Sequence, residues 1–425
     1  MTCRLLPFLC VFFYGKGEGA GLWDRLGPCC AVLILISAHR FCEAGTTALF
    51  LAVNVQRPEI VRLYLQAGAD PFHKDDEGMS VIGIAFQLWC SGVKGDKEMG
   101  ELFPIGRYVD EADFTGLHRA VLLGAGVSGA LAGGGYDGEG KGKGDINGKG
   151  GEGWTALHLA ALKGDASSAK LLVRAGADPD CKTDRLGVTP LYYACRYGHY
   201  EVVKVLLNGG ADVHLKDNYD RQAIHCAGIT ADGRRVLELL LKHGADLEAR
   251  EKNRYTPLTF ATVWGPTDVV EFLIEMGADL GARTGYGDTL IMMAVKVVRH
   301  DRVRMLLRSG ADLQVLDRNH RSILHLLATN SDEEMINIFI GSKLWKGVAT
   351  SAKDELGLTP LSLFNQRDPS EGLREAFDRL LDWVERCNDD ELTAAGDGDE
   401  SEDEFFDAED GELKDNERTL EEAVA

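Results

Sequence analysis

The sequence predicts an all-α fold, a solenoid of stacked helix pairs joined by hairpin loops, and two recurring elements carry this prediction. A Gly-Ala-Asp element recurs along the chain, and its last five copies are spaced 34, 34, 33 and 33 residues apart. A Thr-Pro-Leu-like element recurs in step with it, so each period contains one helix start and one helix end. The glycines of the first element are Gly68, Gly176, Gly210, Gly244, Gly277 and Gly310. The second element begins at Thr47, Ser80, Thr115, Thr155, Thr189, Gln222, Thr256, Thr289, Ser322 and Thr359.

The period that runs over residues 187–220 shows why each repeat predicts two short helices. Thr189 can cap the first helix with its hydroxyl, and Pro190 suits the first helical position, where no backbone donor is needed. Gly198 is the residue type that ends a helix in the left-handed conformation. A broad apolar stripe over residues 202–207 then predicts the second helix. Two helices of about eight residues cannot bury both faces alone, so the unit needs neighbours.

About ten such units lie between Gly45 and Cys387, and their period and motif resemble those of a known family. A period of about 33 residues with a Thr-Pro-Leu-His core is the signature of ankyrin repeats, and the segment WTALHLAALKGDASSAKLLVRAGADPD, residues 154–180, resembles that family closely. The resemblance covers about 80% of the chain and is most specific from Gly151 to Asn319. It implies a long concave face, formed by the first helices and the hairpin tips, on which such stacks bind partners.

Four units depart from this pattern. The second unit, after Met79, lacks a clear second helix, and the third loses its second helix into a glycine run. The ninth keeps both helices but has a longer connection in place of the Gly-Ala-Asp turn. The tenth has a longer and more charged last helix, as expected of a terminal unit with one face in water.

The segment 1–44 is apolar and of uncertain status. Its two apolar runs, residues 5–14 and 29–38, are each about ten residues long and therefore too short to span a bilayer. Three alternatives remain open: a decayed repeat packed under Gly45, a signal or membrane anchor, and residues that are not part of the real protein.

The repeat region, 45–387, contains a glycine-rich insertion at 124–153 that we expect to be flexible, and an acidic tail follows at 388–425. The tail holds 17 acidic and 2 basic residues and so carries most of the net charge of −21. Too charged to fold alone, it is predicted to be disordered. We hypothesise that residues 389–412 of the tail fold back transiently on the basic ridge over residues 250–321 and compete with a ligand; a solubilising tail with no partner is the alternative. Ser401 precedes acidic residues and is a candidate phosphorylation site.

Motifs for chemistry are absent, and we expect no catalytic residue, no metal site and no cofactor. The glycine run matches a phosphate-binding loop at Gly135, Gly140 and Lys141, but Gly142 stands where a hydroxyl is required. His118, His158, His225 and His325 lie one per repeat rather than in one metal-binding group. In ankyrin repeats this histidine bonds the backbone of the neighbouring turn, so the resemblance implies a structural role.

Cysteine usage favours an intracellular protein, cytoplasmic or nuclear. Cys195 and Cys226 replace small apolar helix residues, which indicates buried, reduced thiols rather than disulfide partners. Membrane association is expected only through residues 1–44, and we expect a monomer.

The expected partner-binding residues fall into two groups. The first group follows the small-residue pair of each first helix, a position that faces the partner in ankyrin stacks, and consists of Arg196, Tyr197, Ile229, Val263, Trp264 and Lys296. Tyr197 and Trp264 are expected to be exposed aromatic anchors, although Trp264 could instead pack on the segment that follows it. The second group lies on the hairpin tips and consists of Tyr219, Arg250, Lys252, Arg254, Tyr255, Arg283, Arg318 and Arg321. Lys182, Arg185, Lys216, Arg221 and Tyr286 extend this ridge.

These observations predict a non-catalytic scaffold or adaptor that binds other proteins, acidic peptides among them, on its concave face. Nucleic acid is disfavoured because the chain is acidic overall and Asp184, Asp217, Asp220, Glu251 and Asp317 dilute the basic ridge. A membrane-tethered regulator and a substrate-recognition subunit of a ubiquitin ligase are the alternatives. The scaffold itself does not identify the partner.

Overall fold

The computed structural model describes residues 48–54, 58–73, 80–90, 100–103, 109, 114–124, 126–132, 145–367 and 369–388, and within these ranges it has helices, turns and loops but no β-strand. The predicted all-α fold of stacked helix pairs is therefore confirmed. The chain divides into two compact units, residues 1–302 and 303–425.

The helices are short and come in pairs. Those of the first unit are α4 (Ala48–Asn54), α5 (Pro58–Gln66), α6 (Val81–Cys90), α9 (Gly116–Leu123), α10 (Val127–Ala132), α11 (Ala156–Lys163), α12 (Ala166–Arg174), α13 (Pro190–Arg196), α14 (Tyr200–Asn208), α15 (Ala223–Ala227), α16 (Gly233–Lys242), α17 (Pro257–Trp264), α18 (Thr267–Glu275) and α19 (Leu290–Lys296), with a 3-10 turn at Gly151–Gly153. Helix α20 (His300–Arg308) begins in this unit, and the second unit then contains α21 (Ile323–Asn330), α22 (Glu333–Phe339), α23 (Pro360–Asn365) and α24 (Glu371–Asn388).

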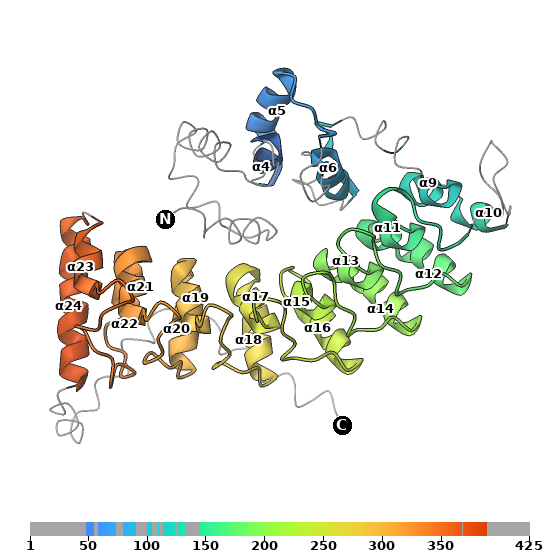
Figure 1. Cartoon of the computed structure of the whole chain (residues 1–425). Coiled ribbons are helices and arrows are strands. Elements are labelled where there is room, and N and C mark those ends of the chain that lie inside the picture. The colour runs from blue at the N-terminus through green and yellow to red at the C-terminus, as the bar shows by residue number, and fades with distance from the viewer. Residues whose placement is uncertain are drawn as a thin grey trace, which may run out of the picture. The chain divides into compact units, whose positions relative to one another are not determined.

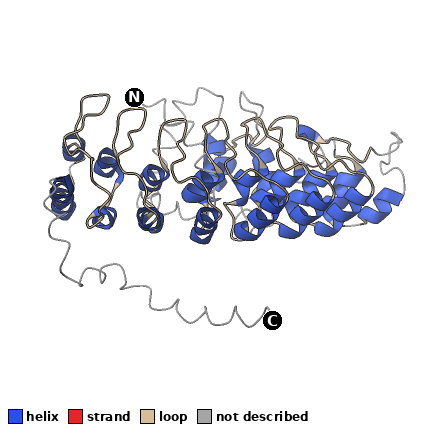
Figure 2. Cartoon of the chain, turned by 90° about the horizontal axis from the view of Figure 1, so that it is seen from below, coloured by secondary structure: helices blue, strands red, loops and turns tan. Residues whose placement is uncertain are grey.

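From α11 onward the first unit has two helical layers (Figure 1). The first helices of successive pairs, α11, α13, α15, α17 and α19, pack side by side, and the second helices, α12, α14, α16 and α18, form the other layer. The loops that lead from each second helix to the next first helix project from one edge of the layers (Figure 2). We call these loops fingers; they comprise residues 175–189, 209–222, 243–256 and 276–289.

Local sequence explains both helix types. The hydroxyls of Thr155, Thr189, Thr256 and Thr289 each accept the backbone N–H of the third helical residue, so the first helices begin where the sequence predicts. Nearly every residue of a first helix is buried, as in α11, because neighbours cover it on several sides. A second helix such as α16 instead buries one stripe and exposes the other.

The third repeat differs from its prediction. Residues 127–132, which the sequence assigns to the glycine-rich insertion, form helix α10, which packs on α9 and α12. Val127 is buried, and this burial outweighs the poor helix propensity of the neighbouring glycine. The prediction that the third repeat has no second helix is therefore wrong.

The second unit confirms the predicted form of the last two repeats. Helix α21 packs on α23 and α22 packs on α24, which at 18 residues is the longest described helix. The rings of Phe364 and Phe377 stack with centroids 4.1 Å apart. Asn388, placed in the tail by the sequence, accepts the backbone N–H of Gly347 at 2.7 Å and donates to the carbonyl of Val348 at 2.8 Å. The folded repeat therefore includes Asn388.

Several predictions concern residues outside the described ranges. These are the apolar segment 1–44, the glycine run at 135–142, residues 91–99 in the second half of the second repeat, and the tail from 389 onward with Ser401. Among the helices that the structure does describe, none combines the length and the apolar character needed to cross a membrane. Cys195 and Cys226 are buried free thiols, as predicted.

Candidate partner-binding surface

Each finger is closed by one side chain that accepts backbone hydrogen bonds across its turn. In the finger 209–222, Asp217 Oδ1 accepts the N–H groups of Tyr219 at 2.8 Å and Arg221 at 2.9 Å. Asp217 Oδ2 binds the Arg221 guanidinium through Nε and Nη2, both at 2.7 Å. The carboxylate is thus buried and its charge is neutralised within its own loop.

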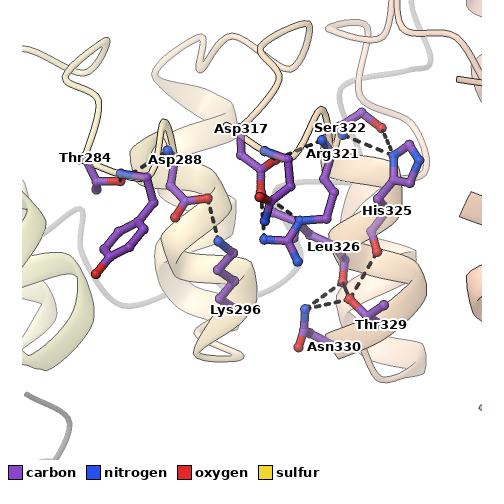
Figure 3. Close-up of polar contacts among 12 residues, drawn as sticks. Thr284, Asp288, Lys296, Asp317, Arg321, Ser322, His325, Leu326, Thr329 and Asn330 are labelled. Atoms are coloured by element: carbon purple, nitrogen blue, oxygen red, sulfur yellow. Dashed lines mark hydrogen bonds and ion pairs between the residues drawn. The ribbon is translucent and has the colours of Figure 1, made fainter. Parts of the chain in front are cut away.

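In the second compact unit, the loop before α21 has the same arrangement. Figure 3 shows Asp317 held by Arg321, with Nε 2.8 Å and Nη2 2.7 Å from Oδ2. The backbone N–H groups of Asn319 and Arg321 donate to Oδ1, each at 2.9 Å. Arg321, predicted to bind a partner, is therefore half-buried and occupied by its own turn.

Glu251 closes the finger 243–256 without an arginine. Its Oε1 accepts the N–H groups of Asn253 at 2.8 Å and Tyr255 at 3.1 Å. Burial raises the pKa of Glu251 above its ordinary value, and these hydrogen bonds oppose that shift. Three of the five acids expected to dilute the basic ridge, Asp217, Glu251 and Asp317, are therefore buried inside the turns of their own loops.

The exposed side chains of the ridge are mostly basic or aromatic, although Asp184 is exposed and Asp220 is half-buried. Arg250, Lys252, Arg254, Arg283 and Arg318 are exposed, as are the rings of Tyr219 and Tyr286, at 40% and 38%.

Neighbouring fingers bring some of these side chains together. Lys252 donates its backbone N–H to the carbonyl of Tyr219 at 3.1 Å, and its ammonium lies 5.6 Å from the centroid of the Tyr219 ring. The guanidinium carbon of Arg221 lies 5.0 Å from the same centroid. The Tyr219 ring is thus flanked by Arg221 of its own finger and by Lys252 of the next finger.

Trp264, Tyr255 and Val263 are not exposed, contrary to expectation. Trp264 is 8% exposed, and its ring lies 5.0 Å from that of Phe260, one helical turn earlier. Together with Met293 they form an apolar cluster. Large apolar side chains occupy the matching positions of adjacent first helices. They therefore pack against one another rather than projecting into solvent.

The remaining predicted residues at the first-helix ends are partly covered. Ile229 packs against the same cluster, while Tyr197 is half-buried with the Arg196 guanidinium 6.0 Å from its ring centroid. The Lys296 ammonium forms an ion pair with Asp288 at 2.5 Å (Figure 3). The first-helix ends therefore offer a partner less exposed charge than the fingers do.

The four histidines at the third position of the first helices each connect one repeat to the next, as the ankyrin resemblance implied. In each, Nδ1 accepts a backbone N–H at the start of its own helix, so Nε2 carries the proton and donates it to a carbonyl of the following loop. The Nε2 to oxygen distances are 2.8 Å for His118 to Trp154, 3.0 Å for His158 to Val188, 3.1 Å for His225 to Ala249 and 3.2 Å for His325 to Leu358. Burial lowers the pKa of both His158 and His225 to about 4, so these rings are neutral structural groups.

Within the described ranges no group of three or more His, Cys, Asp and Glu side chains could hold a metal ion. A small cavity, lined by Gln87, Trp154, Thr183, Arg185, Leu186 and Tyr193, encloses about 10 Å³, which is room for a single water molecule. This cavity is too small for a cofactor.

Comparison with known proteins identifies the same repeat. A model of three ankyrin-repeat copies matches residues 117–217 and 209–284, and a model of a single ankyrin repeat matches residues 44–76. Among curated proteins, neurogenic locus notch homolog protein 2 of Homo sapiens is 36% identical over 133 residues, and neurogenic locus notch homolog protein 1 of Xenopus tropicalis is 35% identical over 132 residues. Each match covers 28% of this chain and 5% of the relative, so the likeness is confined to a small part of those proteins.

Proposed function

Because the chain is an ankyrin-repeat protein, we propose that it acts as a non-catalytic scaffold or adaptor that binds protein partners mainly through the tips of its fingers. Ankyrin repeats are in general modules for protein–protein interaction, so the proposal adds the surface that is used and its chemistry. Free, buried thiols support a cytoplasmic or nuclear location for this activity.

One observation carries the proposal. In the two central fingers, Lys216, Arg250, Lys252 and Arg254 are exposed, and the Lys252 ammonium lies beside the Tyr219 ring, whereas the turn-closing acids Asp217 and Glu251 are buried and hydrogen-bonded. A surface of exposed cations and aromatic rings favours an acidic protein partner. The net charge of −21 for the whole chain makes nucleic acid a poor alternative.

A paired substitution tests this use of the fingers. Lys252→Glu with Arg254→Glu reverses two exposed charges in the finger next to that of Tyr219, while Lys204→Glu with Lys242→Glu makes the same charge change on exposed positions of α14 and α16. Proteins captured from a cell lysate by full-length chain would be quantified for both variants. We expect partners of the native chain to be lost with the finger variant and kept with the helix variant. Capture of the same partners by both would contradict the proposal.

A further inference from the structure

Four cations occupy one register position in four successive fingers. Each immediately precedes the residue that closes its finger turn, namely Thr183, Asp217, Glu251 and Thr284. We call this set the cation row; its members are Lys182, Lys216, Arg250 and Arg283, and all four are exposed.

Hydrogen bonds between fingers fix the spacing of the cation row. Asn218 donates its backbone N–H to the Leu186 carbonyl at 2.9 Å, and the corresponding bond from Gly285 to Asn253 is 2.5 Å long. The Lys182 ammonium also donates to the Lys216 carbonyl at 2.7 Å. The fingers are therefore held in register, and successive cations recur at the packing distance of the helix layers beneath them, about 8–10 Å.

The acids of these loops do not cancel the row. Those that close the turns are buried, Asp184 is paired with Lys149 at 2.6 Å, and Asp220 at the tip of the finger 209–222 is half-buried. A second set lies four residues before each cation, where each carboxylate accepts a backbone N–H at the base of its finger; its members are Asp178, Asp212, Asp246 and Asp279. An acidic ligand is thus repelled from the base of the fingers and attracted toward their tips.

Two of these four fingers also carry an exposed tyrosine. Tyr219 and Tyr286 each lie two residues after the turn-closing residue and are exposed. Polyproline II segments are recognised through surfaces lined with aromatic side chains. A polyproline II helix has three residues per turn and rises about 3.1 Å per residue, so every third side chain lies on one face at a spacing of about 9 Å.

We propose that the cation row binds an extended, acidic polypeptide segment of a partner protein, with carboxylates at every third residue. Each carboxylate meets one finger, and the intervening residues pack on the tyrosines. This inference rests on the proposed scaffold function and specifies the kind of partner that the fingers select.

Two synthetic twelve-residue peptides of equal composition and charge test the spacing. One repeats Glu-Pro-Pro four times, and the other has four consecutive glutamates followed by eight prolines. Binding of each labelled peptide to the full-length chain would be measured by fluorescence anisotropy at low and physiological salt. The periodic peptide is expected to bind about fivefold tighter at low salt, because it reaches more of the row, and to lose affinity as salt rises.

The variant Lys216→Glu with Arg250→Glu removes the centre of the cation row. The periodic peptide should lose its advantage on this variant and keep it on Lys204→Glu with Lys242→Glu, provided that all chains melt at the same temperature. Equal affinity of the native chain for both peptides, or an advantage that survives the row substitution, would overturn the inference. If lysate partners still depend on Lys252 and Arg254 in that case, the spacing is wrong but the scaffold function stands.

Discussion

The ammonium of Lys296 lies 2.5 Å from a carboxylate oxygen of Asp288, and this ion pair joins the end of α19 to the finger turn before it. The Asp288 side chain has no exposure and that of Lys296 is 19% exposed. Lys296→Ala removes the cation that neutralises a buried carboxylate, so we expect the free energy of unfolding to fall by about 2–4 kcal/mol. Chemical denaturation would measure this loss. Lys242→Ala, at an exposed position of α16, serves as the control and should change stability little.

Val298 has a left-handed backbone with φ of 54°, a conformation that β-branched residues rarely adopt. The same position after earlier first helices is held by Gly164 and Gly198, with φ of 74° and 73°. Val298→Gly should therefore raise the free energy of unfolding by about 0.5–1 kcal/mol, since relief of strain exceeds the added chain entropy. The reciprocal change, Gly198→Val, should destabilise, because its Cβ would lie 3.0 Å from Thr230 Oγ1. Thermal melting distinguishes the two, and a destabilised Val298→Gly would contradict the account.

Trp264 is expected to matter for stability and not for partner binding. Trp264→Ala removes the largest member of a buried cluster and should lower the free energy of unfolding by about 3–5 kcal/mol. Trp264→Phe should cost much less, because the indole Nε1 has no hydrogen-bond partner among the described residues. At a temperature where Trp264→Phe is folded, it should capture the same partners as the native chain. A specific loss of partners by this variant would show that Trp264 belongs to the binding surface.

The bridging histidines predict how stability depends on pH. The pKa of His225 is about 4 in the folded chain and near 6.5 when unfolded, so the unfolded state binds more protons between these values. Stability is therefore full above pH 6.5 and falls toward pH 4, by at most about 1.4 kcal/mol per pH unit for each such histidine. His225→Thr, which copies the residue type of Thr259 at the same place in α17, should lose stability at neutral pH and have a shallower slope. Urea unfolding at several pH values compares the variant with the native chain. If the free energy of unfolding depends on pH with the same slope in both, His225 is not the group responsible.

The acidic tail gives a prediction about binding strength. Truncation after Asn388 removes residues that carry most of the net negative charge while keeping the contacts of Asn388 with Gly347 and Val348. Melting should be unchanged, and an acidic peptide should bind more tightly at low salt because repulsion or competition by the tail is gone. Anisotropy titration with the periodic peptide measures this, and unchanged affinity at low salt would show that the tail plays no part.

The repeat and its helices could be predicted because each period contains its own start and stop signals. Thr189, Pro190 and Gly198 act through local backbone chemistry, so sequence alone identifies their roles. Helix α10 could not be predicted in this way because it depends on the burial of Val127 against other helices, which outweighs a local composition rich in glycine.

The binding surface was harder to predict because exposure depends on neighbouring repeats. Trp264 looks like an exposed anchor within its own unit, but Phe260 and Met293 cover it in the stack. In the sequence, Asp217 and Glu251 appear as surface charges that weaken the ridge. In the folded loops, both carboxylates accept backbone hydrogen bonds within their turns and are buried. The shared register of Lys182 and Lys216 is likewise defined by the turn-closing residues that follow them, which only the folded loops identify.

The histidine bridges are unevenly distributed along the first helices. His158 and His225 tie α11 and α15 to the following loops, whereas Tyr192 and Thr259 occupy this position in α13 and α17 and supply no imidazole. In a stack where each repeat contacts only its neighbours, local opening begins at the least strongly joined junctions. Amide hydrogen exchange should therefore be faster around residues 213–221 and 280–288 than in the bridged loops, which makes the fingers that carry Tyr219 and Tyr286 the most adaptable to a partner's shape.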